Sequence, residues 1–168
     1  TGDANSVTVM DTTTDQIIKT IPVGLDPWRA YASPDGKYMV IPNNGDKTIS
    51  IIDAKSHTLV SSLPGGADMT GVNFAQGGQK GYVISREENK VFIYDFITLK
   101  KINQLEMEKE ARLETGSTTP AGKKIYITSS SNNSLYVINT ESDKVKRIKD
   151  VGSFPWGVSI YKGQNYCH

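Results

Sequence analysis

The chain has 168 residues, which is enough for one ordinary domain with a core of its own. Its formal net charge is +1 and its basic and acidic residues are interspersed, which argues against a dedicated nucleic-acid-binding protein with a basic face. No stretch approaches the roughly 18 apolar residues of a transmembrane helix, and the single cysteine excludes an internal disulfide.

The dominant feature of the sequence is a repeat of 42 to 44 residues. Each copy contains a six-residue segment that alternates apolar and polar residues and closes on Asp or Asn. In chain order these segments are SVTVMD at 6–11, TISIID at 48–53, KVFIYD at 90–95 and SLYVIN at 134–139. The alternation predicts strands with one buried face, and the closing residue predicts a turn after each of them.

Three further strands are predicted around each of these segments. A second strand follows the turn, as in QIIKTIPVG, HTLVSSLPG, KKINQLEME and KVKRIKDVG. A strand of small and apolar residues comes next, as in WRAYASP, TGVNFAQ, LETGSTTP and WGVSIY. After a glycine-bearing turn the last strand reads KYMVIP, KGYVIS, KKIYIT and finally YCH. Four antiparallel strands in each period of this length are typical of a β-propeller blade, so the predicted fold class is an all-β propeller.

Several segments also resemble a known repeat family. SPDGKYMVI, NGDKTISIIDAKSHTLVSSLPGG and IPVGLDPWR are similar to the YVTN-type propeller repeat. The resemblance covers essentially the whole chain and is best in the first period, since the second has AQGGQK in place of SPDGK. Repeats of this type occur in surface-layer proteins and in periplasmic proteins similar to the cytochrome d1 domain. The resemblance therefore implies a periplasmic or extracellular propeller and does not define its chemistry.

The repeat predicts one propeller over 1–168 that begins and ends in mid-blade. Complete blades are expected at about 26–67, 68–110 and 111–152, and a further blade is expected to be shared between 5–24 and 153–168. These about four blade equivalents make either a closed four-bladed ring or half of a seven- or eight-bladed ring. A second copy, or a missing part of the same protein, would complete the half ring.

Matching apolar positions of the repeated strand are expected to be buried between neighbouring blades. One set is Val7, Ile49, Val91 and Leu135, and the other is Val9, Ile51, Ile93 and Val137. Truncating Ile51 to Ala is expected to lower the free energy of unfolding by roughly 2–5 kcal/mol.

Strand order predicts that the longer loops share one face, which is the expected binding face. Trp28 and Trp156 follow a proline at matching positions and could stack on a planar ligand, or else fill gaps between blades. Arg29 could pair with a carboxylate or phosphate. Arg86 and Arg112 on the same face favour a small anionic ligand, unless neighbouring Glu87, Glu88, Glu110 and Glu114 neutralise them.

The C-terminal Cys167 and His168 are candidate ligands of copper, zinc or haem iron. Adjacent residues on a strand point to opposite sides, so the two share one metal only if the strand ends there. The alternatives are a buried small residue and a frayed terminus. The sequence has no CxxCH motif for covalent haem attachment and no common catalytic motif.

Two functions follow from these features. The first is a non-catalytic, exported binding or scaffold module whose loop face takes a protein or a small anionic ligand. The alternative is a redox or cofactor-handling propeller similar to cytochrome d1-domain proteins. In that case haem d1 or a metal would lie at the channel mouth, held by Arg29, Arg86, Arg112 and His168.

Overall fold

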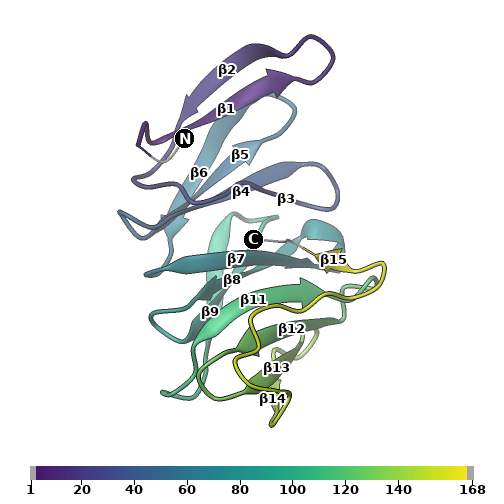
Figure 1. Ribbon diagram of the computed structural model, residues 1–168. Helices are drawn as coiled ribbons and strands as arrows, with labels where there is room; N and C mark the ends of the chain where they lie inside the picture. The colour runs from purple at the N-terminus through teal and green to yellow at the C-terminus, as the bar shows by residue number, and fades with distance from the viewer. Residues whose placement is uncertain (1–2, 166–168) are drawn as a thin grey trace. The chain divides into compact units, whose positions relative to one another are not determined.

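The structure is a computed structural model that describes residues 3–165. Its regular structure is almost entirely β-strand, with one short 3₁₀ turn at Gln76–Gly78. Within residues 3–165, no helix is long and apolar enough to cross a membrane. The chain divides into two compact units, unit 1 at Thr1–Gly66 and unit 2 at Ala67–His168, and each is described by itself (Figure 1).

Unit 1 contains a hairpin and one four-stranded antiparallel sheet. The hairpin pairs β1 (Ser6–Asp11) with β2 (Gln16–Pro22). The sheet, here called blade 1, has the order β3 (Tyr31–Ala32), β4 (Tyr38–Asn43), β5 (Thr48–Asp53) and β6 (Thr58–Pro64). Ile21 of the hairpin packs with Ile41 and Ile52 of blade 1, and the half-buried Val7 and Val9 join this cluster.

Unit 2 contains two more sheets of the same strand order. Blade 2 consists of β7 (Met69–Ala75), β8 (Lys80–Ser85), β9 (Lys90–Asp95) and β10 (Lys100–Glu106). Blade 3 consists of β11 (Leu113–Thr118), β12 (Lys124–Ser129), β13 (Ser134–Asn139) and β14 (Val145–Ile148). Eleven buried residues from the two blades form one apolar cluster between them. The propeller-blade architecture predicted from the repeat is thus confirmed in each unit.

The four repeated segments form β1, β5, β9 and β13 with the predicted bounds. The turn after each strand is held by its closing side chain. In every case the Oδ1 atom accepts hydrogen bonds from the backbone N–H groups two and three residues further on; the four residues are Asp11, Asp53, Asp95 and Asn139. An Asp or Asn at this position therefore specifies the turn by its own chemistry.

The burial predicted for the matching apolar positions holds fully in the two central strands. Ile49, Ile51, Val91 and Ile93 are completely buried. Their counterparts in β1 and β13 are only half-buried; these are Val7, Val9, Leu135 and Val137. In β13, Tyr136 and Ile138 face blade 2, so Leu135 and Val137 lie on the other side of that strand.

The C-terminal segment differs from the prediction. Residues 153–163 form no strand, although WGVSIY was expected to be one. Pro155 has no N–H group for a ladder, and the segment 156–161 is flanked by Phe154 and Lys162, whose φ angles are positive at 52° and 56°. The short strand β15 (Gln164–Asn165) follows and pairs antiparallel with β11. The shared blade of 5–24 and 153–168 stays a prediction, and YCH lies outside the described residues.

Candidate functional site

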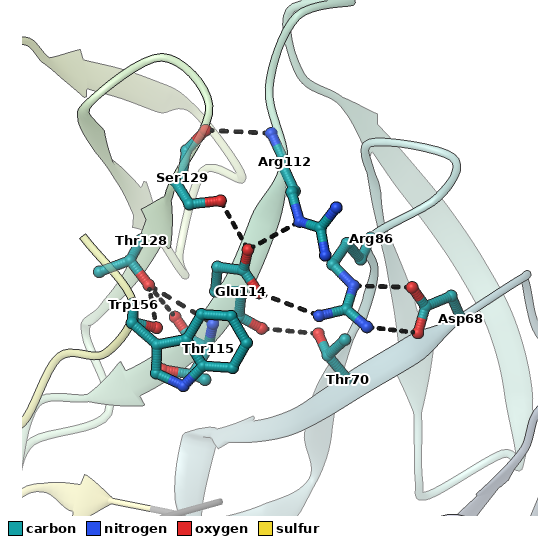
Figure 2. A network of polar contacts seen from close by, with 10 residues as sticks. Asp68, Thr70, Arg86, Arg112, Glu114, Thr115, Thr128, Ser129 and Trp156 are labelled. Carbon is teal, nitrogen blue, oxygen red and sulfur yellow. Dashed lines mark hydrogen bonds and ion pairs between the residues drawn. The ribbon is translucent and has the colours of Figure 1, made fainter. Parts of the chain in front are cut away.

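A network of charged side chains lies where the loops of blades 2 and 3 meet. Its members come from segments that the fold brings to one end of the sheets: Asp68 precedes β7, Arg86 follows β8, and Arg112 precedes β11. Glu114, the second residue of β11, is the centre of the network (Figure 2). These are the loops that the sequence predicted to share one face.

Glu114 is a buried carboxylate with three donors. It is 1% exposed. Its Oε2 accepts a hydrogen bond from Arg86 Nη1 at 3.1 Å, and its Oε1 accepts bonds from Arg112 Nε at 3.0 Å and Ser130 Oγ at 2.6 Å. Two cations and a hydroxyl thus replace the water that the buried charge has lost. Thr70 Oγ1 also donates to the backbone oxygen of Glu114 at 2.6 Å, which ties β7 to β11.

Arg86 is held between two carboxylates. Its Nε and Nη2 atoms donate to the two oxygens of Asp68 at 2.7 and 3.1 Å, in the fork geometry that arginine offers to a carboxylate. The hydrogen bond with Asp68, together with the bond to Glu114, raises the pKa of Arg86. Local neutralisation of Arg86 is therefore observed, but its partners are Asp68 and Glu114 rather than Glu87 and Glu88.

Arg112 is neutralised on one edge only. Its Nε bonds Glu114, while its side chain is 50% exposed. Within residues 3–165, neither Nη atom of Arg112 has a hydrogen-bond partner. The guanidinium therefore presents two donors to solvent from a position that Glu114 fixes.

An aromatic pair lies in the segment next to this network. The rings of Phe154 and Trp156 are stacked, with centroids 6.2 Å apart and planes 15° from parallel. Trp156 is 49% exposed, and its backbone oxygen accepts a hydrogen bond from Thr128 Oγ1 at 3.0 Å (Figure 2). Thr128 Oγ1 also bonds the backbone oxygen of Thr115, the neighbour of Glu114. The backbone at Trp156 is thus linked through Thr128 to the strand that carries the network, and its side chain is half exposed.

Unit 1 carries a second, separate patch around Trp28 and Arg29. Trp28 is 60% exposed and borders an open groove of about 300 Å³ together with Pro27, Arg29 and Ile41. Burial raises the pKa of the Tyr31 hydroxyl above its ordinary value, and the positive charge of the neighbouring Arg29 only partly offsets this rise. Arg29 is therefore engaged with Tyr31 within its own unit. Trp28 and Trp156 are both about half exposed or more, and their two expected roles, stacking on a ligand or filling a gap between blades, stay predictions.

Metal-binding groups do not gather in the part of the chain that the structure describes. Among residues 3–165 no three His, Cys, Asp or Glu side chains are placed to hold a metal ion. His57 lies in the β5–β6 turn of unit 1, beside the turn-forming Asp53. The predicted metal ligands Cys167 and His168 lie outside the described residues.

Sequence reasoning missed the roles of Phe154 and Asp68. A signal for both was present, because Phe154 occupies the repeat position of Asp26 and Asp68, two residues after a glycine. All three have a φ angle near +50°, a conformation that aspartate adopts far more readily than phenylalanine. A phenylalanine in this position indicates a ring that is held in place despite a backbone cost.

Comparison with known proteins identifies the family. The model of the cytochrome d1 haem domain matches residues 1–168. This chain belongs to the cytochrome d1 haem domain family. The expected resemblance to d1-type propellers is thereby confirmed, and no curated protein matches the chain.

Solved structures share the fold of this d1-family chain at low sequence identity. Hydrazine synthase of Kuenenia stuttgartiensis aligns with a TM-score of 0.63 and 17% identity, over 93% of this chain and 64% of that one. The dihydro-heme d1 dehydrogenase NirN in complex with DHE aligns with a TM-score of 0.70 and 16% identity, over 87% of this chain and 33% of that one. The d1-family chain thus spans about two thirds of one neighbour and one third of the other.

Proposed function

We propose that this chain binds haem d1, or a closely related carboxylate-bearing tetrapyrrole, on the loop face of unit 2. The observation that carries the proposal is the half-exposed Arg112, whose Nη atoms have no hydrogen-bond partner among residues 3–165, in the same unit as the half-exposed, stacked pair Phe154 and Trp156. Membership of the cytochrome d1 haem domain family supports it, and so does the fold shared with the dihydro-heme d1 dehydrogenase NirN.

The donor set suits the rim of such a ligand. A tetrapyrrole of this kind carries several carboxylates around a flat ring, and a guanidinium recognises a carboxylate through two parallel hydrogen bonds. Both Nη atoms of Arg112 are available to bond a ligand carboxylate, because Glu114 accepts a hydrogen bond only from its Nε. Arg86 is committed to Asp68 and Glu114, so its contribution is to hold Glu114, and through it Arg112, in position.

The aromatic pair suits the flat face of the ligand. Phe154 and Trp156 are stacked nearly parallel and both are about half exposed, so the pair offers a rigid apolar platform. Burying such a platform against a planar ring removes apolar area from water and adds a stacking contribution. The residues present therefore fit the periphery and the face of the tetrapyrrole.

The described residues of unit 2 include no histidine that could bind the iron of the tetrapyrrole. His57 is the one histidine among residues 3–165, and it lies in the turn region of unit 1. A histidine to hold the iron would come from His168, which lies outside the described residues, or from another chain. When bound, the tetrapyrrole would supply redox chemistry, while Arg112 and Trp156 would anchor and orient it.

Absorption titration with haem d1 tests the proposal. Wild-type protein is expected to bind the chromophore with a shifted spectrum. Arg112→Gln and Trp156→Ala are each expected to weaken binding about tenfold, as expected for losing a charge-assisted pair or a stacked ring. Arg147→Gln is the matched control, since Arg147 lies on the outer strand β14 and pairs with Glu108. Unchanged affinity in both test variants would contradict the assigned site, and no binding by wild type would contradict the function.

The non-catalytic scaffold, which was the first sequence-based hypothesis, stays a prediction that the comparisons favour less than cofactor handling. A periplasmic or extracellular location belongs to the same proposal, because it is implied by the resemblance to periplasmic d1-type propellers. Fractionation of the native host followed by detection of the chain tests it.

A further inference from the structure

The loop between β4 and β5 of blade 1 contains a chemically reactive pair, Asn44 and Gly45. It is the only place in the sequence where glycine follows asparagine. Such a pair is prone to deamidation, because glycine has no side chain to hinder the approach of its backbone nitrogen to the asparagine side chain. The nitrogen of Gly45 bonds to Cγ of Asn44, and ammonia leaves with the proton of that nitrogen. Water then opens the resulting succinimide ring to aspartate or isoaspartate.

In the folded chain the attacking nitrogen is held in a hydrogen bond. The backbone N–H of Gly45 donates to the backbone oxygen of Leu25 at 3.0 Å, and the N–H of Asn44 donates to that of Asp26 at 2.9 Å. The nitrogen of Gly45 must lose its proton and turn toward the Asn44 side chain before it can react. The hydrogen bond to Leu25 opposes both changes, so the reaction requires this bond to open.

Leu25 is bound to the same loop through its own N–H group. Asp46 Oδ2 accepts a hydrogen bond from the backbone N–H of Leu25 at 3.1 Å, and Asp46 Oδ1 accepts one from Thr48 Oγ1 at 2.7 Å. Both backbone groups of Leu25 therefore bind the β4–β5 loop. We call the contact of Leu25 with Gly45 and Asp46 the loop contact.

Close packing requires glycine at position 45. A Cβ atom there would lie 2.9 Å from Leu25 Cβ and 3.1 Å from Asp26 Cβ, so a larger residue would displace the segment before blade 1. The equivalent residues after β8 and β12 are Glu87 and Ser131. Within residues 3–165, the backbone N–H groups of Glu87 and Ser131 donate to no backbone oxygen of the segment before their own blade. The close approach that places glycine after asparagine is thus a feature of blade 1.

Water can reach the reactive pair from the surface. Gly45 and Asp46 are exposed and Asn44 is half-buried, whereas the preceding Asn43 is completely buried. The reactants are therefore in place at Asn44, and the state of the loop contact limits the reaction.

We propose that Asn44–Gly45 is a site of spontaneous deamidation and that opening of the loop contact sets its rate. The site lies within unit 1, and none of its residues belongs to the network around Glu114. The proposal is therefore independent of the proposed tetrapyrrole ligand.

Both products of the reaction weaken the contact that restrains it. A carboxylate at position 44 adds a negative charge to a loop that already contains Asp46 and is bonded to the segment of Asp26. Isoaspartate also lengthens the backbone by one methylene group just before Gly45, which shifts that residue relative to Leu25. Deamidation thus makes a loosening of this loop permanent.

Peptide mass spectrometry after incubation at mildly alkaline pH tests the proposal. Trypsin releases the peptide 38–47 between Lys37 and Lys47, and fragment spectra distinguish Asn44 from Asn43. The conversion of amide to carboxylate is expected at Asn44. It is expected to be at least about tenfold slower in buffer than in denaturing urea, because the folded chain must first open locally. Equal rates in buffer and urea would overturn the proposal, and so would conversion in urea at Asn43 in place of Asn44.

Asp46→Ala tests the loop contact directly. It removes the side-chain acceptor of Leu25 and is expected to speed deamidation in buffer about fivefold, the effect of losing one hydrogen bond. Glu88→Ala is the matched control, because Glu88 Oε1 accepts a hydrogen bond from the backbone N–H of Ala67 in blade 2 in the same way, at 2.8 Å. Its rate at Asn44 is expected to equal that of wild type. If Asp46→Ala reacts no faster than Glu88→Ala, the loop contact does not control the reaction.

A urea series on wild type separates local opening from unfolding of unit 1, and it decides the question even if Asp46→Ala does not fold. Opening of the loop contact exposes little surface, so the rate at Asn44 is expected to be nearly independent of urea below the onset of unfolding. A rate that rises in proportion to the unfolded population over the same range would show that unfolding, and not the loop contact, limits the reaction.

Discussion

At the scale of single residues, the buried carboxylate of Glu114 is the most constrained group in unit 2. Its carboxylate pairs with Arg86 and Arg112 and accepts a hydrogen bond from the hydroxyl of Ser130. Glu114→Ala is expected to lower the free energy of unfolding by roughly 3–5 kcal/mol, because it leaves a largely buried guanidinium with one carboxylate fewer. Urea unfolding followed by circular dichroism measures the change.

Arg112→Gln provides the comparison within the same network. Arg112 is half exposed and its ion pair is screened by solvent, so its loss is expected to cost less than about 1 kcal/mol. The two variants are therefore expected to differ clearly in stability although they break the same ion pair. Equal, small effects would show that Glu114 is not the centre of the network.

At the scale of strands, matching repeat positions allow one substitution to be compared in two settings. Val91 of β9 and Val7 of β1 have the same place in the repeat, but Val91 is completely buried and Val7 half-buried. Val91→Ala is expected to cost roughly 2–3 kcal/mol, from two lost methyl groups and the cavity they leave. Val7→Ala is expected to cost less than half as much, since its side chain already contacts water. Thermal and urea unfolding of the pair measure the difference, and similar losses would contradict the burial assigned to Val7.

The strands themselves were predictable because two local signals agree. Period-two alternation defines each strand, and the Asp or Asn that closes it makes the turn, so the bounds of β1, β5, β9 and β13 follow from the sequence. The segment 153–163 has the alternation of WGVSIY but pairs with no strand within residues 3–165, and a strand without a partner is not formed. Period-two alternation therefore predicts where a strand can form, and pairing with a neighbouring strand decides whether it forms.

The candidate site was predictable in Arg86, Arg112 and Trp156, and Glu114 was one of the carboxylates expected to neutralise Arg112. Arg86 and Arg112 stand out in a sequence with few arginines, and loop position places them on one face. The partners of Arg86 did not follow, because Asp68 lies 18 residues from it and Glu114 lies 28 residues from it. Pairing across that separation depends on blade packing and not on neighbours in the sequence. Phe154 was not predicted as a site residue because its stacking on Trp156 depends on a positive φ angle that is rare for phenylalanine.

At the scale of the whole molecule, the two units differ in the size of the apolar cluster that lies within each of them. One apolar cluster of unit 2 has eleven buried members, whereas the cluster around Ile21 in unit 1 has three, apart from the separately buried Ile49 and Ile51. A chain of unit 1's length is also near the lower limit at which a core alone supports folding. Residues 67–168 expressed alone are therefore expected to unfold cooperatively, and residues 1–66 alone are expected to remain largely unfolded.

Circular dichroism melts and amide hydrogen exchange on the two fragments check this prediction. Unit 2 also contains Arg112, Glu114 and Trp156, so a folded fragment is expected to keep the haem d1 affinity of the full chain. A fragment that folds but binds no tetrapyrrole would place the binding residues elsewhere.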